Sequence, residues 1–411
     1  MFPAARLSPD LSPRTLIRGR VSPGFEAVRE AFAENFTSRH ELGGACCAYY
    51  HGEKVVDLWG GLRNKQTGEP WQEDTMVITY SATKGLAAMT MALAHSRGWL
   101  DYDERVAAYW PGFATNGKDK ITVRQLLAHQ AGLFALDEPV TAELVRDLDR
   151  LAIVLARQKP AWPPGTRQAY HAITLGFYES ELLRRIDPRQ RSLGQFFEDE
   201  IATPLGLEVY IRLPESIPNS RLAVMSRPGP LQMLTGFSPR VLFEFYSRHS
   251  NIHRALEGSA LPHDEQRVYA RNFEVPSGGG VGTARAIARA YSAFVTGDQL
   301  GLKKDTLSQL AAPATPAANG FYDECMKGEA QFSLGFMKPC ESIPFGNPTS
   351  FGSPGAGGAM GFADPTAGVG YGYVTSQMGT SLSGDPRDLA LRDALYAAIS
   401  RRECSCESRC S

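Results

Sequence analysis

The sequence predicts an α+β protein in which terminal helices flank an antiparallel sheet and a mainly helical region is inserted between the strands. Strand-like segments gather toward both ends of the chain, in 44–61 and again in 332–337 and 358–378. Between about 81 and 270 the apolar residues recur mainly at helical spacing. Strand clusters that flank a helical block favour α+β layering over alternating parallel βαβ units.

The chain opens with an amphipathic helix and a pair of strands. Residues 24–38 carry three phenylalanines and a valine at helical spacing, and 44–61 reads as two strands around a His-Gly-Glu turn. Helical runs punctuated by Pro and Gly are then expected at 81–97, 122–130, 140–157, 172–186 and 192–201. The strands at 332–337 and 358–378 follow, and a last helix is expected near 386–402.

This order divides the chain into a discontinuous domain and an insertion. An α/β sandwich domain is expected to combine 24–80 with 275–400, and a helical domain to occupy 81–274. Residues 1–23 are expected to form a flexible N-terminal segment, and 401–411 a cysteine-containing tail beyond the last helix.

Charge and hydropathy indicate a small, roughly neutral partner. The 43 Lys and Arg residues nearly balance 44 Asp and Glu, and no block of like charge marks a surface for nucleic acid or anionic membrane. No apolar stretch approaches the roughly 20 residues that span a bilayer, so we expect a soluble protein. Self-association, as a homo-oligomer, is left open by the sequence.

Cysteine usage and the N-terminus bear on compartment and metal content. The seven cysteines form an odd set with no framework spacing, which fits a reducing compartment. We place the protein in the cytosol, with the mitochondrion as the alternative, because the N-terminus is Arg-rich but contains prolines that oppose an amphipathic presequence helix. Three tail cysteines lack a fourth metal ligand, so neither a metal nor a cofactor is expected.

The stretch TYSATKGLAAMTMALAHSRGW, residues 79–99, places Ser81 and Lys84 at the start of an apolar helical run. The i,i+3 spacing puts both side chains on one helix face. Burial would lower the pKa of the lysine toward the range that a general base needs. The alternative is a helix start with serine as N-cap, since Ser-x-x-Lys arises by chance about once in a chain of this size.

A second candidate is Tyr170 in PPGTRQAYHAITLG, residues 163–176, where a Pro-Gly turn precedes a helical run. A tyrosine on such a loop can reach into a cleft. Its hydroxyl could share a proton with Ser81 and Lys84 if the lysine charge lowers its pKa. The alternative is a core tyrosine whose hydroxyl satisfies a neighbouring group.

The third candidate is the Gly-rich stretch SFGSPGAGGAMGFADP, residues 350–365, which leads into a strand. Glycines let backbone amides approach a ligand closely, so the amide of Ala356, opposite that of Ser81, could bind a developing oxyanion. The alternative is a β-bulge or a turn without a ligand.

Together these three stretches, in this order, resemble the serine β-lactamase and penicillin-binding-protein family, in particular class C β-lactamases and family VIII carboxylesterases. Ser81-Ala82-Thr83-Lys84 is similar to the Ser-x-x-Lys motif of that family, and Tyr170-His171-Ala172 falls at its Tyr-x-Asn. Ser353-Pro354-Gly355 falls where the family has Lys-Thr-Gly or His-x-Gly. The segments VVDLWGG, ITVRQLLAHQAGL, PPGT and GGGVGTARAIARAY also resemble the family in its usual order.

The resemblance implies a β-lactamase/transpeptidase-like fold with a cleft between the sandwich and the helical insertion. It implies Ser81 as nucleophile, Lys84 as its activating partner and Tyr170 as general acid/base. The oxyanion would lie between the amides of Ser81 and Ala356. We expect Gly355, Ser353 and His171 to contribute to the oxyanion and substrate site beside them.

Two departures from the family pattern indicate the substrate class. Ala172 replaces an asparagine that binds the substrate amide, and Ser353 replaces a Lys or His that attracts the substrate carboxylate. An uncharged or weakly charged ester, cleaved through an acyl-enzyme on Ser81, is therefore expected in preference to an antibiotic. The alternatives are an amide-directed peptidase or β-lactamase with the same residues, and a catalytically idle scaffold or self-assembling protein.

Other motifs add little. His129 is not expected to be catalytic, because family members carry a histidine in that stretch without a base role. No Gly-x-Ser-x-Gly elbow occurs, which counts against an α/β-hydrolase. The segments 210–275 and 313–348, which are expected to shape the pocket, show no pattern from which acyl or alcohol specificity can be predicted.

Overall fold

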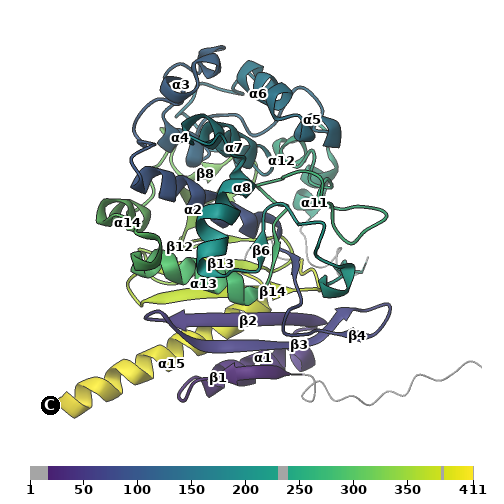
Figure 1. Ribbon diagram of the computed structural model, residues 1–411, viewed down its shortest axis with the longest axis vertical. Helices are drawn as coiled ribbons and strands as arrows, with labels where there is room; N and C mark the ends of the chain where they lie inside the picture. Colours follow the sequence, from purple (N-terminus) through teal and green to yellow (C-terminus); the bar gives the residue numbers. More distant parts are fainter. Residues whose placement is uncertain (1–16, 230–238, 381–383, 411) are drawn as a thin grey trace, which may run out of the picture.

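The computed structural model describes residues 17–229, 239–380 and 384–410. Its central layer is a sheet whose neighbouring strands all pair antiparallel (Figure 1). The order of its main path is β1 (Arg18–Val21), β3 (Glu53–Asn64), β2 (Gly43–Tyr50), β14 (Val369–Thr375), β13 (Met360–Asp364), β12 (Phe351–Pro354), β11 (Phe336–Lys338) and β10 (Gln331–Ser333), with β4 (Glu69–Pro70) on β3.

The two ends of the chain meet where β2 pairs with β14. In this register Cys47 faces Gly372 and Ala48 faces Tyr371. The N-terminal and C-terminal strands that the sequence predicts therefore form one sheet, with the helical region leaving it after β4 and returning before β10.

Helices cover both faces of this sheet. α1 (Glu26–Ser38) and α15 (Pro386–Cys410) pack together on one face, where Phe25, Phe32, Leu391 and Leu395 share an apolar cluster. α13 (Ala284–Thr296) lies on the other face, and it approaches so closely that a Cβ on Gly372 would come within 2.5 Å of the Ala284 carbonyl oxygen. Glycine at this strand position is therefore required by helix–sheet packing.

The inserted region is mainly helical. Its elements are η2 (Tyr80–Ala82), α2 (Thr83–Ser96), α3 (Val106–Tyr109), η3 (Pro111–Ala114), α4 (Val123–Leu127), α5 (Ala142–Arg146), α6 (Leu148–Arg157), α7 (Thr174–Ile186), α8 (Leu193–Phe197), the π-turn η4 (Glu198–Ala202), α9 (Thr203–Leu205), η5 (Asn219–Arg221), α11 (Pro239–Tyr246) and α12 (Asn251–Ala255). After α13 come η6 (Asp298–Leu300) and α14 (Lys304–Ala311). Two small sheets join β5 (Val77–Ile78), β7 (Val281–Gly282) and β6 (Val209–Tyr210), and β8 (Tyr322–Asp323) with β9 (Gly328–Glu329).

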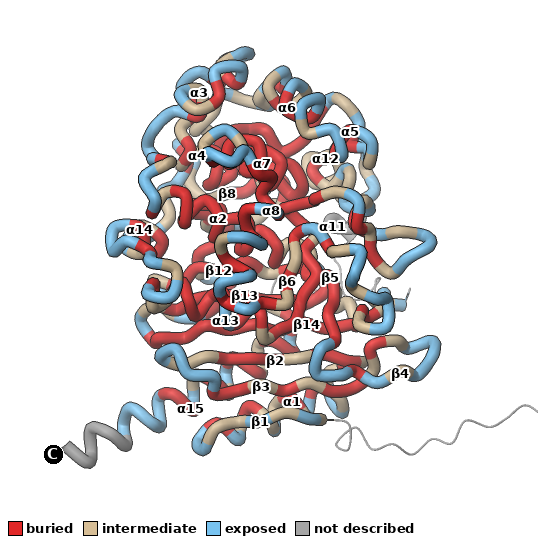
Figure 2. Tube along the Cα trace, viewed as in Figure 1, coloured by how far each residue is buried: buried red, intermediate tan, exposed pale blue. Residues whose placement is uncertain are grey.

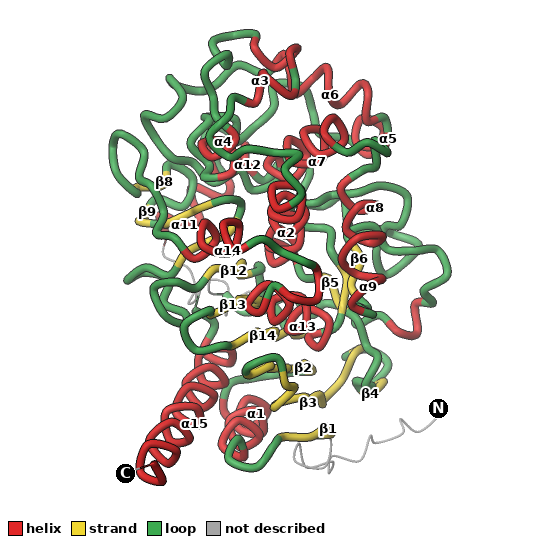
Figure 3. Tube along the Cα trace, turned by 60° about the vertical axis from the view of Figure 1, so that its left-hand side comes forward, coloured by secondary structure: helices red, strands yellow, loops and turns green. Residues whose placement is uncertain are grey.

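α2 is the central helix of this region. All of its residues except His95 are buried, and it packs against α7, α8 and α14 (Figures 2 and 3). A helix that is apolar on every side is stable only inside a core. The buried helix therefore gives the residues at its N-terminal end a fixed position between the sheet and the helical region.

The fold class predicted from the sequence is confirmed, and several boundaries move. The helical run predicted at 140–157 is divided at Asp147 into α5 and α6. The final helix runs to Cys410, so the tail predicted from 401 is helical in its backbone. Within the segment predicted to be flexible, Arg18–Val21 pairs with β3 as strand β1. A four-residue segment is too short to show the apolar alternation of a strand, so its pairing with β3 could not be predicted from the sequence. Residues 1–16 lie outside the described part of the chain.

The proposed division into a sandwich and a helical domain remains a prediction.

No helix in the described ranges combines the length and apolar character needed to cross a membrane. Among the same residues, no group of three His, Cys, Asp or Glu side chains is arranged to hold a metal ion.

Candidate active site

Ser81 lies in the 3₁₀ turn η2, between β5 and α2. Thr79 anchors this turn, because its amide donates to the Gly280 carbonyl at 2.8 Å and its own carbonyl accepts from the Ala82 amide at 3.1 Å. Tyr80 has φ of +46°, in the left-handed region that non-glycine residues seldom adopt. The N-cap of α2 is Ala82, with no side-chain cap bond, so the structure does not use Ser81 as a helix cap.

The side chains of Ser81, Lys84 and Tyr170 meet. The Tyr170 hydroxyl donates to Ser81 Oγ at 2.8 Å, and Lys84 Nζ lies 3.4 Å from the same oxygen. Lys84 Nζ also lies 4.7 Å from the centre of the Tyr170 ring. Two groups that can transfer protons thus converge on one partly exposed hydroxyl.

Two backbone carbonyls hold the buried lysine in place. Lys84 Nζ donates to the carbonyl oxygens of Ala172 at 2.6 Å and Ser277 at 2.8 Å. Ser277, on the loop before β7, was not predicted from the sequence. At position 172 the chain lacks an amide side chain, and its backbone carbonyl contacts the lysine.

Burial sets the protonation of both partners of Ser81. Removal from water lowers the pKa of Lys84 to about 7, and the charge of Glu179 opposes this shift. Burial raises the pKa of Tyr170, and the hydrogen bond with Ser81 lowers it by less. The net shift of the Tyr170 pKa is therefore upward, so the condition stated for proton sharing, a pKa lowered by the lysine charge, is not met. At neutral pH Tyr170 is a proton donor, and Lys84 is the group that can accept a proton.

Residues far along the chain position Tyr170. The amides of Cys325 and Met326 donate to Asp323 at 2.9 and 2.8 Å. Burial raises the pKa of this carboxyl, and hydrogen bonds with the backbones of Met326 and Tyr170 oppose the rise. Gln168 Nε2 donates to Asp323 at 3.3 Å. Strand β8 thus ties down the loop that carries Tyr170, and nothing in the local sequence marks Asp323 for this role.

His171 and His129 support the same loop from inside the protein. Both are fully buried. His171 Nε2 accepts from the Leu133 amide at 3.1 Å, and His129 Nδ1 accepts from the His171 amide at 3.0 Å. His171 Nδ1 can then donate to the Ala169 carbonyl, 2.7 Å away. Burial lowers the pKa of both imidazoles, that of His171 to about 3. The geometry gives His171 a supporting position in place of the substrate contact expected from the sequence.

The Gly-rich stretch lies beside Ser81. The Ser353 hydroxyl donates to the Ser81 carbonyl oxygen at 2.7 Å, so it holds the nucleophile turn. Gly355 is packed so tightly on this turn that a Cβ would collide with the Thr79 carbonyl oxygen. Ala356 is exposed in the turn between β12 and β13, and its amide donates no hydrogen bond within the described part of the chain. An oxyanion site between the Ser81 and Ala356 amides stays a prediction.

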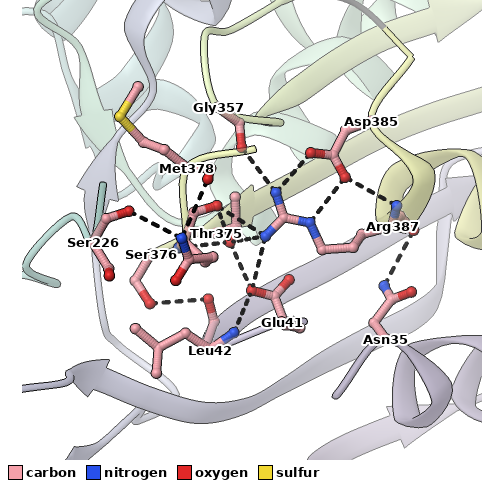
Figure 4. A network of polar contacts seen from close by, with 12 residues as sticks. Asn35, Glu41, Leu42, Ser226, Gly357, Thr375, Ser376, Met378, Asp385 and Arg387 are labelled. Carbon is pink, nitrogen blue, oxygen red and sulfur yellow. Dashed lines mark hydrogen bonds and ion pairs between the residues drawn. The ribbon is translucent and has the colours of Figure 1, made fainter. Parts of the chain in front are cut away.

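An arginine on α15 anchors the turn that carries Ala356 (Figure 4). Arg387 Nη2 donates to the Gly357 carbonyl oxygen at 3.0 Å and to Asp385 Oδ2 at 2.6 Å. Its Nη1 lies 3.4 Å from Glu41 Oε1 and donates to Thr375 Oγ1 at 3.1 Å. This buried network links β14, α15 and the segment between α1 and β2 to the residue that follows Ala356, and sequence analysis did not identify it.

Comparisons with known proteins agree with this geometry. The family model described as Beta-lactamase matches residues 28–396. The Esterase/beta-lactamase LipL of Mycobacterium tuberculosis is 31% identical over 369 residues, which cover 88% of this chain and 83% of that protein. A crystal structure of a family VIII carboxylesterase is 36% identical, with a TM-score of 0.81, and the match covers 93% of this chain and 99% of that one. A penicillin-binding-protein homologue from Caulobacter crescentus is 32% identical, with a TM-score of 0.78 and coverage of 93% and 99%.

Proposed function

The chain belongs to the beta-lactamase family, and we propose that it is a serine hydrolase that cleaves small-molecule esters through an acyl-enzyme on Ser81. The observation that carries the proposal is the convergence of Lys84 Nζ and the Tyr170 hydroxyl on Ser81 Oγ. The relatives named as an esterase and a carboxylesterase support the reaction class.

The protonation states assign the steps of acylation. Neutral Lys84 accepts the Ser81 proton while Oγ attacks the ester carbonyl carbon. The amides of Ser81 and Ala356 stabilise the oxyanion of the tetrahedral intermediate. When the C–O bond of the ester breaks, Tyr170 donates a proton to the leaving alkoxide, and the proton held by Lys84 then returns the Tyr170 phenolate to its neutral form. Water then releases the acyl group by the same steps in reverse.

Two positions favour esters over anionic lactams. Ala172 has no side-chain amide to bind a substrate amide, and its carbonyl oxygen is engaged by Lys84. The Ser353 hydroxyl is engaged by the Ser81 carbonyl and provides no positive charge for a carboxylate. The penicillin-binding-protein homologue and the second half of the name of LipL favour amide or lactam turnover as the second candidate. An idle scaffold would not need three converging groups.

A substrate panel separates these functions. We expect kcat/KM for p-nitrophenyl acetate and butyrate to exceed that for nitrocefin and for D-amino-acid p-nitroanilides by about tenfold or more, because one substrate-amide contact and one carboxylate contact are absent. A fluorophosphonate probe is expected to label Ser81, as mass spectrometry of the labelled peptide would show. Faster turnover of lactam or amide would assign the second candidate, and labelling at another residue would contradict the site.

The network around Arg387 predicts that a change at this residue weakens stabilisation of the oxyanion, and so lowers kcat, without weakening substrate binding. Arg387→Lys keeps the charge but loses the planar fork that reaches Gly357 and Asp385 together, so we expect kcat to fall about tenfold with little change in KM. Arg392→Lys is the matched control, since Arg392 is a buried arginine on the same helix that pairs with Asp388 at 2.8 Å. Equal loss of kcat in both variants would mean that only helix packing is affected.

A further inference from the structure

Ser277 joins Lys84 to the start of a helix. It is fully buried in the turn before β7. Its carbonyl oxygen accepts from Lys84 Nζ at 2.8 Å, and its side-chain oxygen accepts from the amide of Gly176, in the first turn of α7, at 2.7 Å. The two partners are 193 and 101 residues away along the chain. One residue therefore fixes Lys84 relative to α7.

The Ser277 hydroxyl acts as a cap for α7. The first amides of a helix have no partner within the helix, and a serine or threonine just before the helix usually accepts from one of them. In α7 the N-cap residue is Ile173, which makes no side-chain cap bond. Gly176, the third residue of the helix, instead donates its amide to Ser277 Oγ. Loss of this hydroxyl would leave a buried amide without its partner and would loosen the hold of the helix on the turn.

Gly176 allows the turn to approach α7 this closely. A Cβ at this position would lie 2.6 Å from the Ser277 amide nitrogen and 2.7 Å from the Pro276 carbonyl carbon. Glycine weakens a helix relative to alanine, so its presence in α7 has a packing reason. The turn is itself fixed, because the Gly279 amide donates to the Val275 carbonyl oxygen at 2.7 Å. Both its own turn and α7 therefore hold the Ser277 carbonyl group in place.

Two carbonyl groups decide how the amine of Lys84 is oriented. A neutral lysine amine has two hydrogens and one lone pair, and a carbonyl oxygen can only accept. The carbonyl oxygens of Ala172 at 2.6 Å and Ser277 at 2.8 Å therefore take the two hydrogens. The remaining hydrogen-bond contact of Nζ within the described residues is Ser81 Oγ, at 3.4 Å. The lone pair then faces Ser81 Oγ, whose own hydrogen is left for the amine because this oxygen accepts from Tyr170.

We propose that Ser277 is a positioning residue for the proton transfer from Ser81 to Lys84. Its hydroxyl, bonded to the Gly176 amide, holds its carbonyl group in place. That carbonyl group and the one of Ala172 turn the lone pair of Lys84 toward Ser81 Oγ. Ala172 directly precedes the N-cap of α7, so both carbonyl groups are placed by the start of the same helix. The role rests on the proposed function in taking Ser81 as nucleophile and Lys84 as base.

Ser277→Ala removes the hydroxyl and keeps the backbone carbonyl group. We expect kcat/KM for p-nitrophenyl acetate, and the second-order rate constant of fluorophosphonate labelling, to fall together by about tenfold. Both rates depend on a well-oriented Lys84 that accepts the Ser81 proton. Unchanged rates in the folded variant would overturn the proposal.

Lys84→Met as a second background shows whether the effect passes through the lysine. If Ser277 acts by orienting Lys84, Ser277→Ala should lower kcat/KM by less than about twofold when Lys84 is already replaced. A residue that only supports the fold would lower the residual activity by the same factor in both backgrounds. Such an additive result would remove Ser277 from the proton transfer.

Ser180→Ala is the matched control. Ser180 is a buried serine on α7 whose hydroxyl accepts one backbone amide, that of Leu193, at 3.3 Å. It takes no part in the hydrogen bonds that Lys84 makes within the described ranges. We expect the two alanine variants to lose similar thermal stability, and only Ser277→Ala to lose activity. Equal loss of activity in both would mean that the hydroxyl of Ser277 serves only the packing of α7.

Hydrogen exchange at the Gly176 amide measures the cap without any turnover. Exchange in folded Ser277→Ala should be about tenfold faster than in wild type or Ser180→Ala, and an unchanged rate would contradict the proposal. Equal ester hydrolysis by wild type and Ser81→Ala would instead overturn the proposed function, whatever the exchange rates. An inactive Ser81→Ala combined with full activity in Ser277→Ala would overturn the positioning role alone.

Discussion

Ser81→Ala is expected to lower kcat/KM for p-nitrophenyl acetate by about 10⁴-fold or more and to abolish labelling by a fluorophosphonate. The variant removes the oxygen on which Lys84 and Tyr170 converge, at 3.4 and 2.8 Å, so no acyl-enzyme can form. The fold should be unaffected, because among the described residues Ser81 Oγ hydrogen-bonds only with these two groups, and the Ser81 carbonyl keeps its bond from Ser353. Steady-state kinetics and mass spectrometry of the probe adduct measure both results.

Ser353→Ala is the control for this experiment. It removes a hydroxyl next to the nucleophile but leaves Ser81 Oγ in place, so labelling should persist and activity should fall by much less. Equal ester hydrolysis by wild type and Ser81→Ala would show that another residue, or none, carries the reaction.

Lys84→Met is expected to reduce kcat/KM by about 100-fold or more, since it removes the group that accepts the Ser81 proton. It should also alter stability in a pH-dependent way. The pKa of Lys84 is about 7 when folded, against 10.5 ordinarily, so its burial cost is fully present below pH 7 and disappears toward pH 10.5. The stability of the variant relative to wild type should therefore decline as pH rises through that window, by about 1.4 kcal/mol for each unit at most.

Lys118→Met separates the loss of catalysis from the pH-dependent change in stability. Lys118 is also buried, with its amine bonded to the carbonyl oxygens of Ala156 at 2.8 Å and Gln158 at 2.6 Å, and burial lowers its pKa to about 8. It lies outside the group around Ser81. We expect a similar pH trend in thermal stability, with ester hydrolysis retained. Loss of activity in both variants would indicate a general loss of structure, and retention in both would remove Lys84 from the mechanism.

Local patterns were enough to predict the elements that carry the site. The i,i+3 spacing of Ser81 and Lys84 predicts that their side chains share one face, and Lys84 Nζ lies 3.4 Å from Ser81 Oγ although Ser81 belongs to the 3₁₀ turn before α2. The Pro-Gly turn before Tyr170 and the glycines around Ala356 likewise indicate chain that can approach a cleft. Only their order along the chain, and the resemblance it carries, joined them into one expected site.

The groups that support the site were not predicted, because each acts across a long distance in sequence. Asp323 is 155 residues from Gln168, and Arg387 is 30 residues from Gly357. For His171 the sequence predicted a role that the structure does not support, since its place next to Tyr170 suggested a substrate contact. The loop turns it inward, where both ring nitrogens are hydrogen-bonded within the protein.

By itself the sequence determined the α+β class from its periodicity and predicted Ser81 and Lys84 as a pair from their short spacing. Tyr170, 89 residues from Ser81, was joined to them only through the family resemblance. Tertiary structure alone decided the protonation of these groups. The pKa of Lys84 falls and that of Tyr170 rises because the folded chain removes both from water. Desolvation and long-range charge depend on which segments enclose a group, and that is set only when the whole chain has folded.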